Sequence, residues 1–155
     1  MQIRIISILL LLVLLLTACQ SGTVGDIDLA PAEAKWGFQD FKYDGILVCI
    51  THEESMKFIE YTPEDFAEIG CTNIKDMSSA AAEQIQRVMR GEISEDQWGA
   101  WMDRNITQER IDSFRRILFL ELEDQTREGV LRALTIMEHK ENIEKAQPNW
   151  TLSTN

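Results

Sequence analysis

The sequence has few of the residues that build most metal and redox sites. It holds three cysteines and two histidines, His52 and His139, with no Cys-x-x-Cys or His-x-x-x-His pair. Zinc sites need closely spaced ligands of this kind, so we expect no metal and no other cofactor. Basic residues are also scarce, because 15 lysines and arginines stand against 26 acidic residues, a net charge of −11. Such a polyanion repels phosphate backbones, which argues against nucleic acid as a partner.

Enzyme motifs are missing as well. The chain has no nucleophile elbow, no phosphate-binding glycine loop and no dinucleotide fingerprint. His52, Glu53 and Glu54 form one trio with acid–base potential, but they follow a predicted strand, where a solvated turn is the simpler interpretation. We therefore predict a protein that is not an enzyme.

An apolar run opens the chain. Residues 5–16 are apolar apart from Ser7. A helix of twelve residues spans about 18 Å, which is too short for a hydrocarbon core of ~30 Å. This length is typical of the apolar core of an export signal, and we assign residues 1–18 to a signal peptide.

The residues after this run, Leu16-Thr17-Ala18-Cys19, resemble the lipobox of bacterial lipoproteins. The resemblance implies cleavage between Ala18 and Cys19 and acylation of Cys19, which anchors the protein to the membrane on its extracytoplasmic side. Gln20 stands where an aspartate commonly retains lipoproteins in the inner membrane, so in a host with two membranes we expect the outer one. We interpret residues 19–42 as the lipidated N-terminus and a flexible tether.

Two segments alternate as β-strands do, at 45–52 and at 115–123. In the first segment one face carries Ile46, Val48 and Ile50, and the other carries Leu47, Cys49 and Thr51. In the second segment Leu118, Leu120 and Leu122 share one face, while Ile117, Phe119, Glu121 and Glu123 share the other. That last face is apolar at one end and acidic at the other, so we expect it to be partly solvated. Weaker strands are predicted at 71–77 and 142–150.

Helix signals lie between these strands. Thr62 and Pro63 are suited to begin a helix and Gly70 to end it, and Thr126 is suited to cap a helix that runs to Lys140. Residues 79–113 have helical periodicity, with Gly91 as a stop and a second helix predicted around Trp98, Trp101 and Met102.

The order of elements predicts an α+β fold. Two strand–helix–strand units interleave into a ferredoxin-like split βαβ sandwich, a four-stranded antiparallel sheet with its helices on one face. We place this domain at 43–155, with a helical insertion at 79–113 between the second and third strands. In that strand order the third strand separates the first from the second. A Cys49–Cys71 disulfide is the alternative, but we favour two free thiols because the Cα atoms of a disulfide lie within about 7 Å.

The body also resembles subtilisin-type protease propeptides and related inhibitors. The matching residues are the strand at 117–122, the helix segment Gly129-Val130-Leu131-Arg132-Ala133-Leu134 and the closing Ala146-Gln147-Pro148-Asn149-Trp150. The resemblance implies a ferredoxin-like domain whose open sheet face packs against a protease, as an inhibitor or a folding assistant acting in trans. It casts Trp150, Thr151, Leu152, Ser153, Thr154 and Asn155 as a tail that binds the partner. The alternative is a structural or envelope-associated lipoprotein with a different partner.

Overall fold

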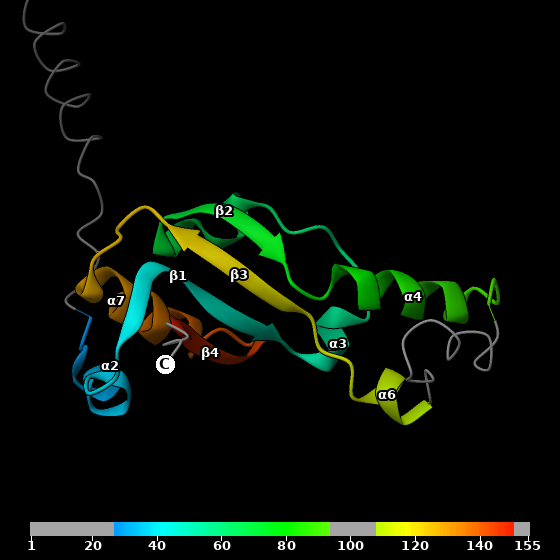
Figure 1. Ribbon diagram of the computed structural model, residues 1–155, viewed down its shortest axis with the longest axis horizontal. Helices are drawn as coiled ribbons and strands as arrows, with labels where there is room; N and C mark the ends of the chain where they lie inside the picture. The colour runs from blue at the N-terminus through cyan, green and yellow to red at the C-terminus, as the bar shows by residue number, and fades with distance from the viewer. Residues whose placement is uncertain (1–26, 94–107, 151–155) are drawn as a thin grey trace, which may run out of the picture.

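A computed structural model describes residues 27–93 and 108–150 (Figure 1). Four strands form one sheet in the order β2-β3-β1-β4, and every neighbouring pair is antiparallel. The strands are β1 (Phe41–Ile50), β2 (Cys71–Asp76), β3 (Ile117–Leu122) and β4 (Ile143–Trp150). This order is ferredoxin-like, so the predicted fold class is confirmed. β4 lies at an edge of the sheet, where Pro148 has no ladder hydrogen bond to donate.

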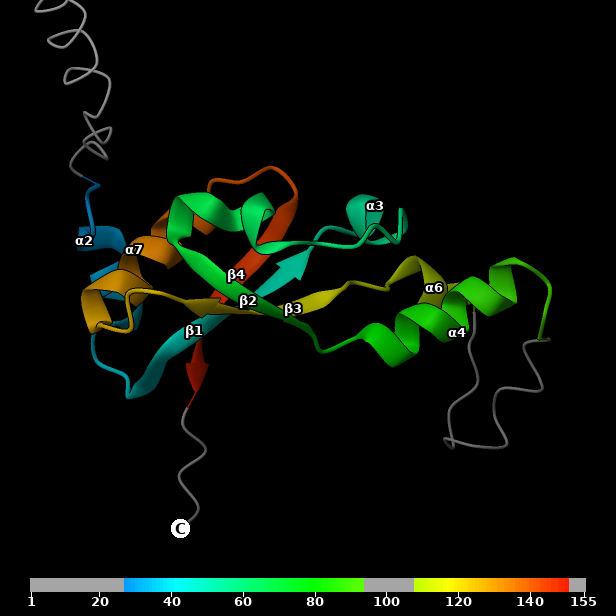
Figure 2. The same cartoon turned by 90° about the horizontal axis from the view of Figure 1, so that it is seen from above.

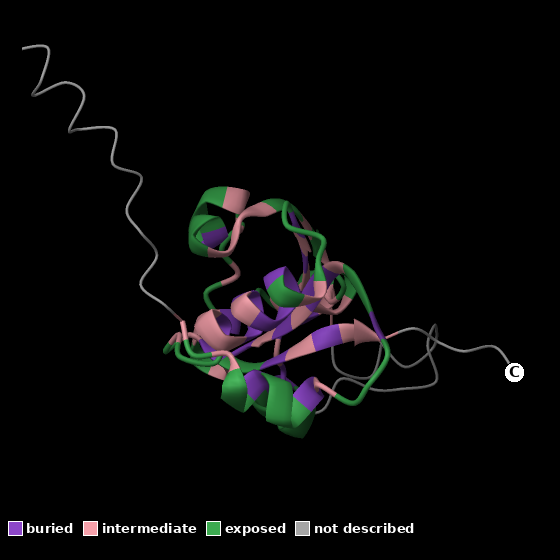
Figure 3. Cartoon of the chain, turned by 90° about the vertical axis from the view of Figure 1, so that its left-hand side faces the viewer, coloured by how far each residue is buried: buried purple, intermediate pink, exposed green. Residues whose placement is uncertain are grey.

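The alternation predicted for the two central strands is confirmed. Buried residues line the strands and the inner sides of the helices (purple in Figure 3). The core side of β1 and β3 consists of fully buried aliphatic residues, namely Ile46, Val48, Ile50, Leu118, Leu120 and Leu122. The residues between them point to the opposite face, because successive side chains of a strand alternate.

The helices cover one face of this sheet. α7 (Arg127–Met137) packs on β1 and β4 through Val130, Leu131, Leu134 and Met137. Its predicted cap is confirmed, since the Oγ1 atom of Thr126 accepts a hydrogen bond from the backbone N–H of Gly129 at 3.0 Å. The helix ends at Met137, slightly before the expected Lys140.

The first crossover is shorter and tighter. It contains α3 (His52–Ser55) and the 3₁₀ helix η1 (Pro63–Ile69), which packs against β2. The backbone N–H of Thr62 donates to Asp65 at 2.8 Å, and Gly70 ends η1 in the left-handed conformation with φ +66°. The predicted start and stop of this helix are therefore confirmed, although its form is 3₁₀.

The N-terminal boundary differs from the expectation. α2 (Ala30–Trp36) packs against α7, and both Ala32 and Trp36 lie in the main core. The Trp36 and Trp150 rings lie 5.6 Å apart, and β1 already begins at Phe41. The second half of the tether predicted at 19–42 is therefore folded. No local sequence pattern predicts α2, because this helix is short and is stabilised by aromatic rings that lie far away in the sequence.

Among the described residues, two helices lie between β2 and β3, namely α4 (Ser79–Met89) and α6 (Gln108–Asp112), and the helical insertion predicted over 79–113 as a whole stays a prediction. Ile85 of α4, Ile111 of α6 and Phe114 just after α6 form a second buried cluster, apart from the main core. Figure 2 shows that α4 and α6 extend beyond the end of the sheet. The helix expected around Trp98 and Trp101 lies outside the described residues. None of the helices in the described ranges is long and apolar enough to cross a bilayer.

The cysteine prediction is confirmed. Cys49 and Cys71 are free. β3 separates their strands, and the two residues pair with opposite ends of it, Cys49 with Ile117 and Cys71 with Leu122. This separation is too large for a disulfide.

Candidate functional site

Most of the site residues predicted from the sequence lie outside the described residues. These are Ala18 and Cys19 at the proposed lipidation site and Thr151, Leu152, Ser153, Thr154 and Asn155 of the tail. Trp150 is described. It is the last residue of β4, pairs with Phe41 and packs on Trp36, in line with the strand predicted at 142–150, and its role in binding a partner stays a prediction.

The sheet face opposite α7 is the candidate site, and Figure 1 looks onto it. Cross-strand pairing places Leu47 beside Phe119 and Cys49 beside Ile117 on this open face. We call these four residues the apolar patch. Leu47, Cys49 and Phe119 are half-buried, and Ile117 keeps 43% of its surface exposed. Both α4 and α6 lie to one side, so the described helices leave the patch uncovered.

Gly45 leaves the space that the Phe119 ring of the apolar patch occupies. A Cβ atom at this position would lie 2.8 Å from the Cζ atom of Phe119 and 2.2 Å from the carbonyl oxygen of Leu120. Both approaches are closer than real Cβ atoms allow, so the Phe119 ring lies where only a glycine leaves space. β1 also shifts its register with β4 between Lys42 and Ile46. The glycine in this irregular stretch lets an aromatic ring lie close against the sheet.

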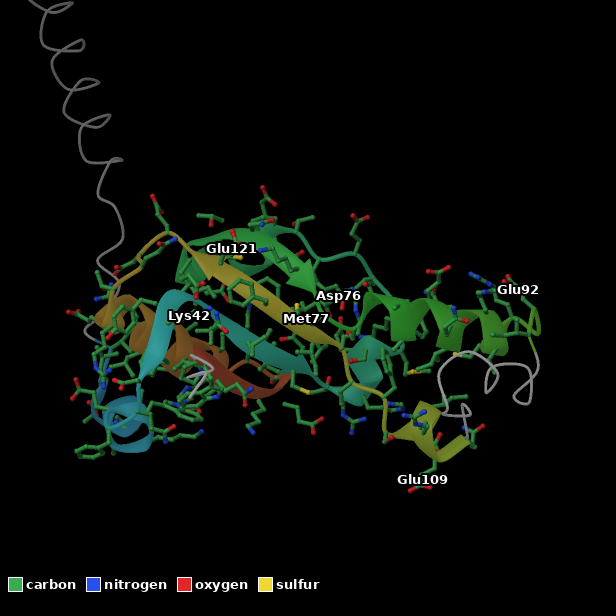
Figure 4. The ribbon with its side chains drawn as sticks, in the orientation of Figure 1. Lys42, Asp76, Met77, Glu92, Glu109 and Glu121 are labelled. Carbon is green, nitrogen blue, oxygen red and sulfur yellow. The ribbon has the colours of Figure 1, made fainter. Side chains whose placement is uncertain are left out.

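Charged side chains border the apolar patch, as Figure 4 shows for Lys42 and Glu121. Lys75 pairs with Glu121 at 2.8 Å, and its Nζ atom lies 5.6 Å from the centre of the Phe119 ring. The hydrogen bond that Lys75 donates lowers the pKa of Glu121. Asn149 donates to Asp44 at 2.9 Å. An apolar centre with a polar border is the usual anatomy of a protein-binding surface.

A buried polar junction lies at the end of the sheet where α4 begins. The guanidinium of Arg116 donates to Asp76 through Nε at 3.0 Å and through Nη2 at 2.6 Å, and it lies 5.1 Å from the Tyr61 ring. The backbone N–H and hydroxyl of Ser78 both donate to the other oxygen of Asp76. The Oγ atom of Ser55 accepts from the Arg116 N–H at 2.9 Å. The hydrogen bonds of these groups go to one another and to the backbone, so we assign the junction a structural role.

His52 and its acidic neighbours also make local contacts. The Nδ1 atom of His52 lies 3.0 Å from the carbonyl oxygen of Phe114, and Glu54 pairs with Lys57. Within 27–93 and 108–150, no three His, Cys, Asp or Glu side chains are arranged to hold a metal ion. The open face is therefore the site that the described geometry best supports.

Sequence reasoning missed three features of this region. These are the Arg116–Asp76 ion pair, the space that Gly45 leaves for Phe119, and the position of Lys42 on the open face. The Asp76-Met77-Ser78 turn signal indicates only the hydrogen bond from Ser78 to Asp76, because aspartate often accepts from the backbone two residues on, and it does not point to Arg116. The other two depend on strand register, which no local pattern shows.

Comparison of the chain with protein-family models, with curated proteins and with solved structures gave no match. A function is therefore argued from the geometry of the open face together with the sequence motifs.

Proposed function

We propose that the protein is a membrane-anchored extracytoplasmic lipoprotein whose folded domain is a non-catalytic protein-binding module. The observation that carries the binding role is the apolar patch on a sheet face that the described helices leave uncovered. In a ferredoxin-like sandwich the helices bury only one face, and a partner can bury the other.

The anchor places this module close to a bilayer. The lipobox-like sequence ends at Cys19, and α2 begins at Ala30. The ten or so residues between them reach at most roughly 35 Å when fully extended. The open face would therefore meet partners at or near the same membrane.

A subtilisin-type protease is the partner class that we propose first. The support is the resemblance of residues 115–150 to protease propeptides, together with a fold that leaves one sheet face open. The module would then act as an inhibitor or a folding assistant for a separate protease. The alternative is a structural or envelope-associated lipoprotein that uses the same face for another protein.

The test uses the full chain in phosphatidylcholine nanodiscs and a purified subtilisin-type protease. We expect slow, tight inhibition, measured as loss of protease activity over time. Ile117→Gln removes exposed apolar surface from the patch and should weaken inhibition about ten-fold. Ile59→Gln is the matched control, because Ile59 is 42% exposed, close to the 43% of Ile117, but lies in the loop after α3. It should leave inhibition unchanged.

Two results would contradict the proposal. Rapid digestion of the chain without inhibition would overturn the protease role and favour the envelope alternative. Equal weakening by Ile117→Gln and Ile59→Gln would show that inhibition does not use the open face.

Membrane anchoring has its own test. Cys19→Ala should release the protein from the membrane fraction, because acyl chains hold a soluble domain to a bilayer at ~0.8 kcal/mol per buried methylene. Cys71→Ala is the control and should leave the protein in that fraction, since Cys71 is a free thiol in β2. Unchanged sedimentation of Cys19→Ala with membranes would refute the anchor.

A further inference from the structure

We infer that the partner of the open face is a protein surface whose apolar centre is flanked by carboxylates. This inference rests on the proposed function, because it names the chemistry of the partner for the same face. The observation behind it is the position of two lysines that have no carboxylate within pairing distance in the described part of the chain.

Four of the six lysines form ion pairs within the chain. They are Lys35 with Glu138, Lys57 with Glu54, Lys75 with Glu121 and Lys140 with Glu68. Among the residues that the structure describes, Lys42 and Lys145 are the two lysines without a carboxylate in pairing distance. In a chain with a net charge of −11, most cations find an acidic neighbour. These two exposed lysines do not.

Both unpaired lysines lie on the open face. Lys145 pairs across the strands with Cys49 of the apolar patch, and Lys42 pairs with Asn149. Asn149 in turn donates to Asp44, in the stretch of β1 where the register with β4 shifts. Figure 4 shows Lys42 in front of the sheet on this face. Lys145 and Asn149 lie four positions apart along β4, roughly 13 Å at 3.3 Å per residue.

The charge of this face differs from that of the whole molecule. Three lysines lie on it, at positions 42, 75 and 145, with the carboxylates of Asp44 and Glu121, and the Arg115–Glu144 ion pair lies near Cys49 and adds no net charge. Lys75 and Glu121 already satisfy each other. An acidic partner would therefore gain two new ion pairs around the apolar patch, and complementary charge also steers association. A second copy of the chain fits less well, because two bodies of charge −11 repel each other.

The test measures which charge the face prefers. The probes are two helical peptides of about 20 residues with the same leucine stripe, flanked by glutamates in one and by lysines in the other. Binding to the full chain in phosphatidylcholine nanodiscs is measured by surface plasmon resonance, with empty nanodiscs as the reference. The net charge of the chain alone would favour the lysine peptide. The inference predicts the opposite order, about ten-fold in favour of the glutamate peptide at low salt, and a smaller ratio at high salt.

Two double variants with equal net charge locate the effect. Lys42→Gln with Lys145→Gln should remove most of the preference for the glutamate peptide. Lys35→Gln with Lys57→Gln should leave it intact, because those lysines lie off the open face and pair with Glu138 and Glu54.

The outcomes separate this inference from the proposed function. Preference for the lysine peptide, or equal loss in both double variants, would overturn the acidic partner. If either peptide still lost affinity in Ile117→Gln, the open face would remain a protein-binding surface. Failure of both peptides to bind would contradict the acidic partner and would also count against the binding role of the face.

Discussion

Arg116 and Asp76 join the start of β3 to the end of β2 through an ion pair with an Nη2–Oδ2 distance of 2.6 Å. Their side chains are only 10% and 19% exposed, so the pair is largely shielded from solvent. α4 begins three residues after Asp76. The ion pair therefore holds the point where the chain leaves β2 toward α4.

Removing the arginine should destabilise the fold. Arg116→Met leaves Asp76 as an unpaired, partly buried charge, and we expect a loss of about 2–3 kcal/mol in the free energy of unfolding. Urea unfolding followed by circular dichroism measures it. Arg132→Met is the control, because the Arg132–Glu128 pair on α7 is exposed and should contribute less than about 0.5 kcal/mol. Equal effects of the two variants would show that the junction carries no special stability.

The same junction predicts a pH dependence. Partial burial by itself would raise the pKa of Asp76, but hydrogen bonds from Ser78 and Arg116 outweigh it and hold that pKa below the usual value. A lowered pKa in the folded state adds stability above the pKa of the unfolded chain, about 4, and this stability is lost as the pH falls through the folded pKa. The gap in unfolding free energy between the natural chain and Asp76→Asn should therefore be full near pH 7 and shrink toward pH 3.

Urea titrations at several pH values test this dependence. The control is Glu128→Gln, whose exposed carboxylate should change stability little at either pH. A gap between Asp76→Asn and the natural chain that stays constant from pH 7 to pH 3 would contradict the prediction.

Gly45 should tolerate no side chain. Gly45→Ala places a methyl group against the Phe119 ring and the Leu120 carbonyl oxygen, so the ring or the strand must move, at a cost of about 1–3 kcal/mol. Thermal unfolding measures this cost. Gly91→Asn is the comparison, since open space surrounds Gly91 and asparagine tolerates its left-handed backbone. A Gly45→Ala variant as stable as the natural chain would mean that the ring is easily displaced.

The corrected N-terminal boundary predicts different outcomes for two truncations. A chain that begins at residue 27 keeps α2, whereas a chain that begins at residue 43 loses Trp36 and Phe41 from the core. We expect the longer chain to be more stable by about 3 kcal/mol or more, as for the removal of one large buried aromatic side chain. Urea unfolding of both chains decides it. Equal free energies of unfolding would show that residues 30–36 do not stabilise the folded domain and belong to the tether.

The strands and helix ends were predictable because they depend on near neighbours. The alternation of Leu118, Leu120 and Leu122 with Ile117 and Phe119 indicated which side of β3 is buried. The cap at Thr126 and the left-handed stop at Gly70 follow from residue types within a few positions. From these elements the strand order and the two free cysteines could be derived.

The candidate site was predictable only in outline. An open face follows from the fold class, since its helices cover one side of the sheet. Which charges border it does not, because the register places Lys42 opposite Asn149, more than a hundred residues away. The order of the peptide probes therefore tests a property that the sequence did not show.

The sequence by itself determined most elements of the sandwich and their order, because each depends on short-range periodicity and capping. Only the tertiary structure decided that Ala32 and Trp36 of α2 lie in the core with Trp150 packed against it, that Arg116 pairs with Asp76, and that the unpaired lysines share one face. These features join residues far apart in the chain, and the free energy of such contacts depends on packing and register that no single segment contains.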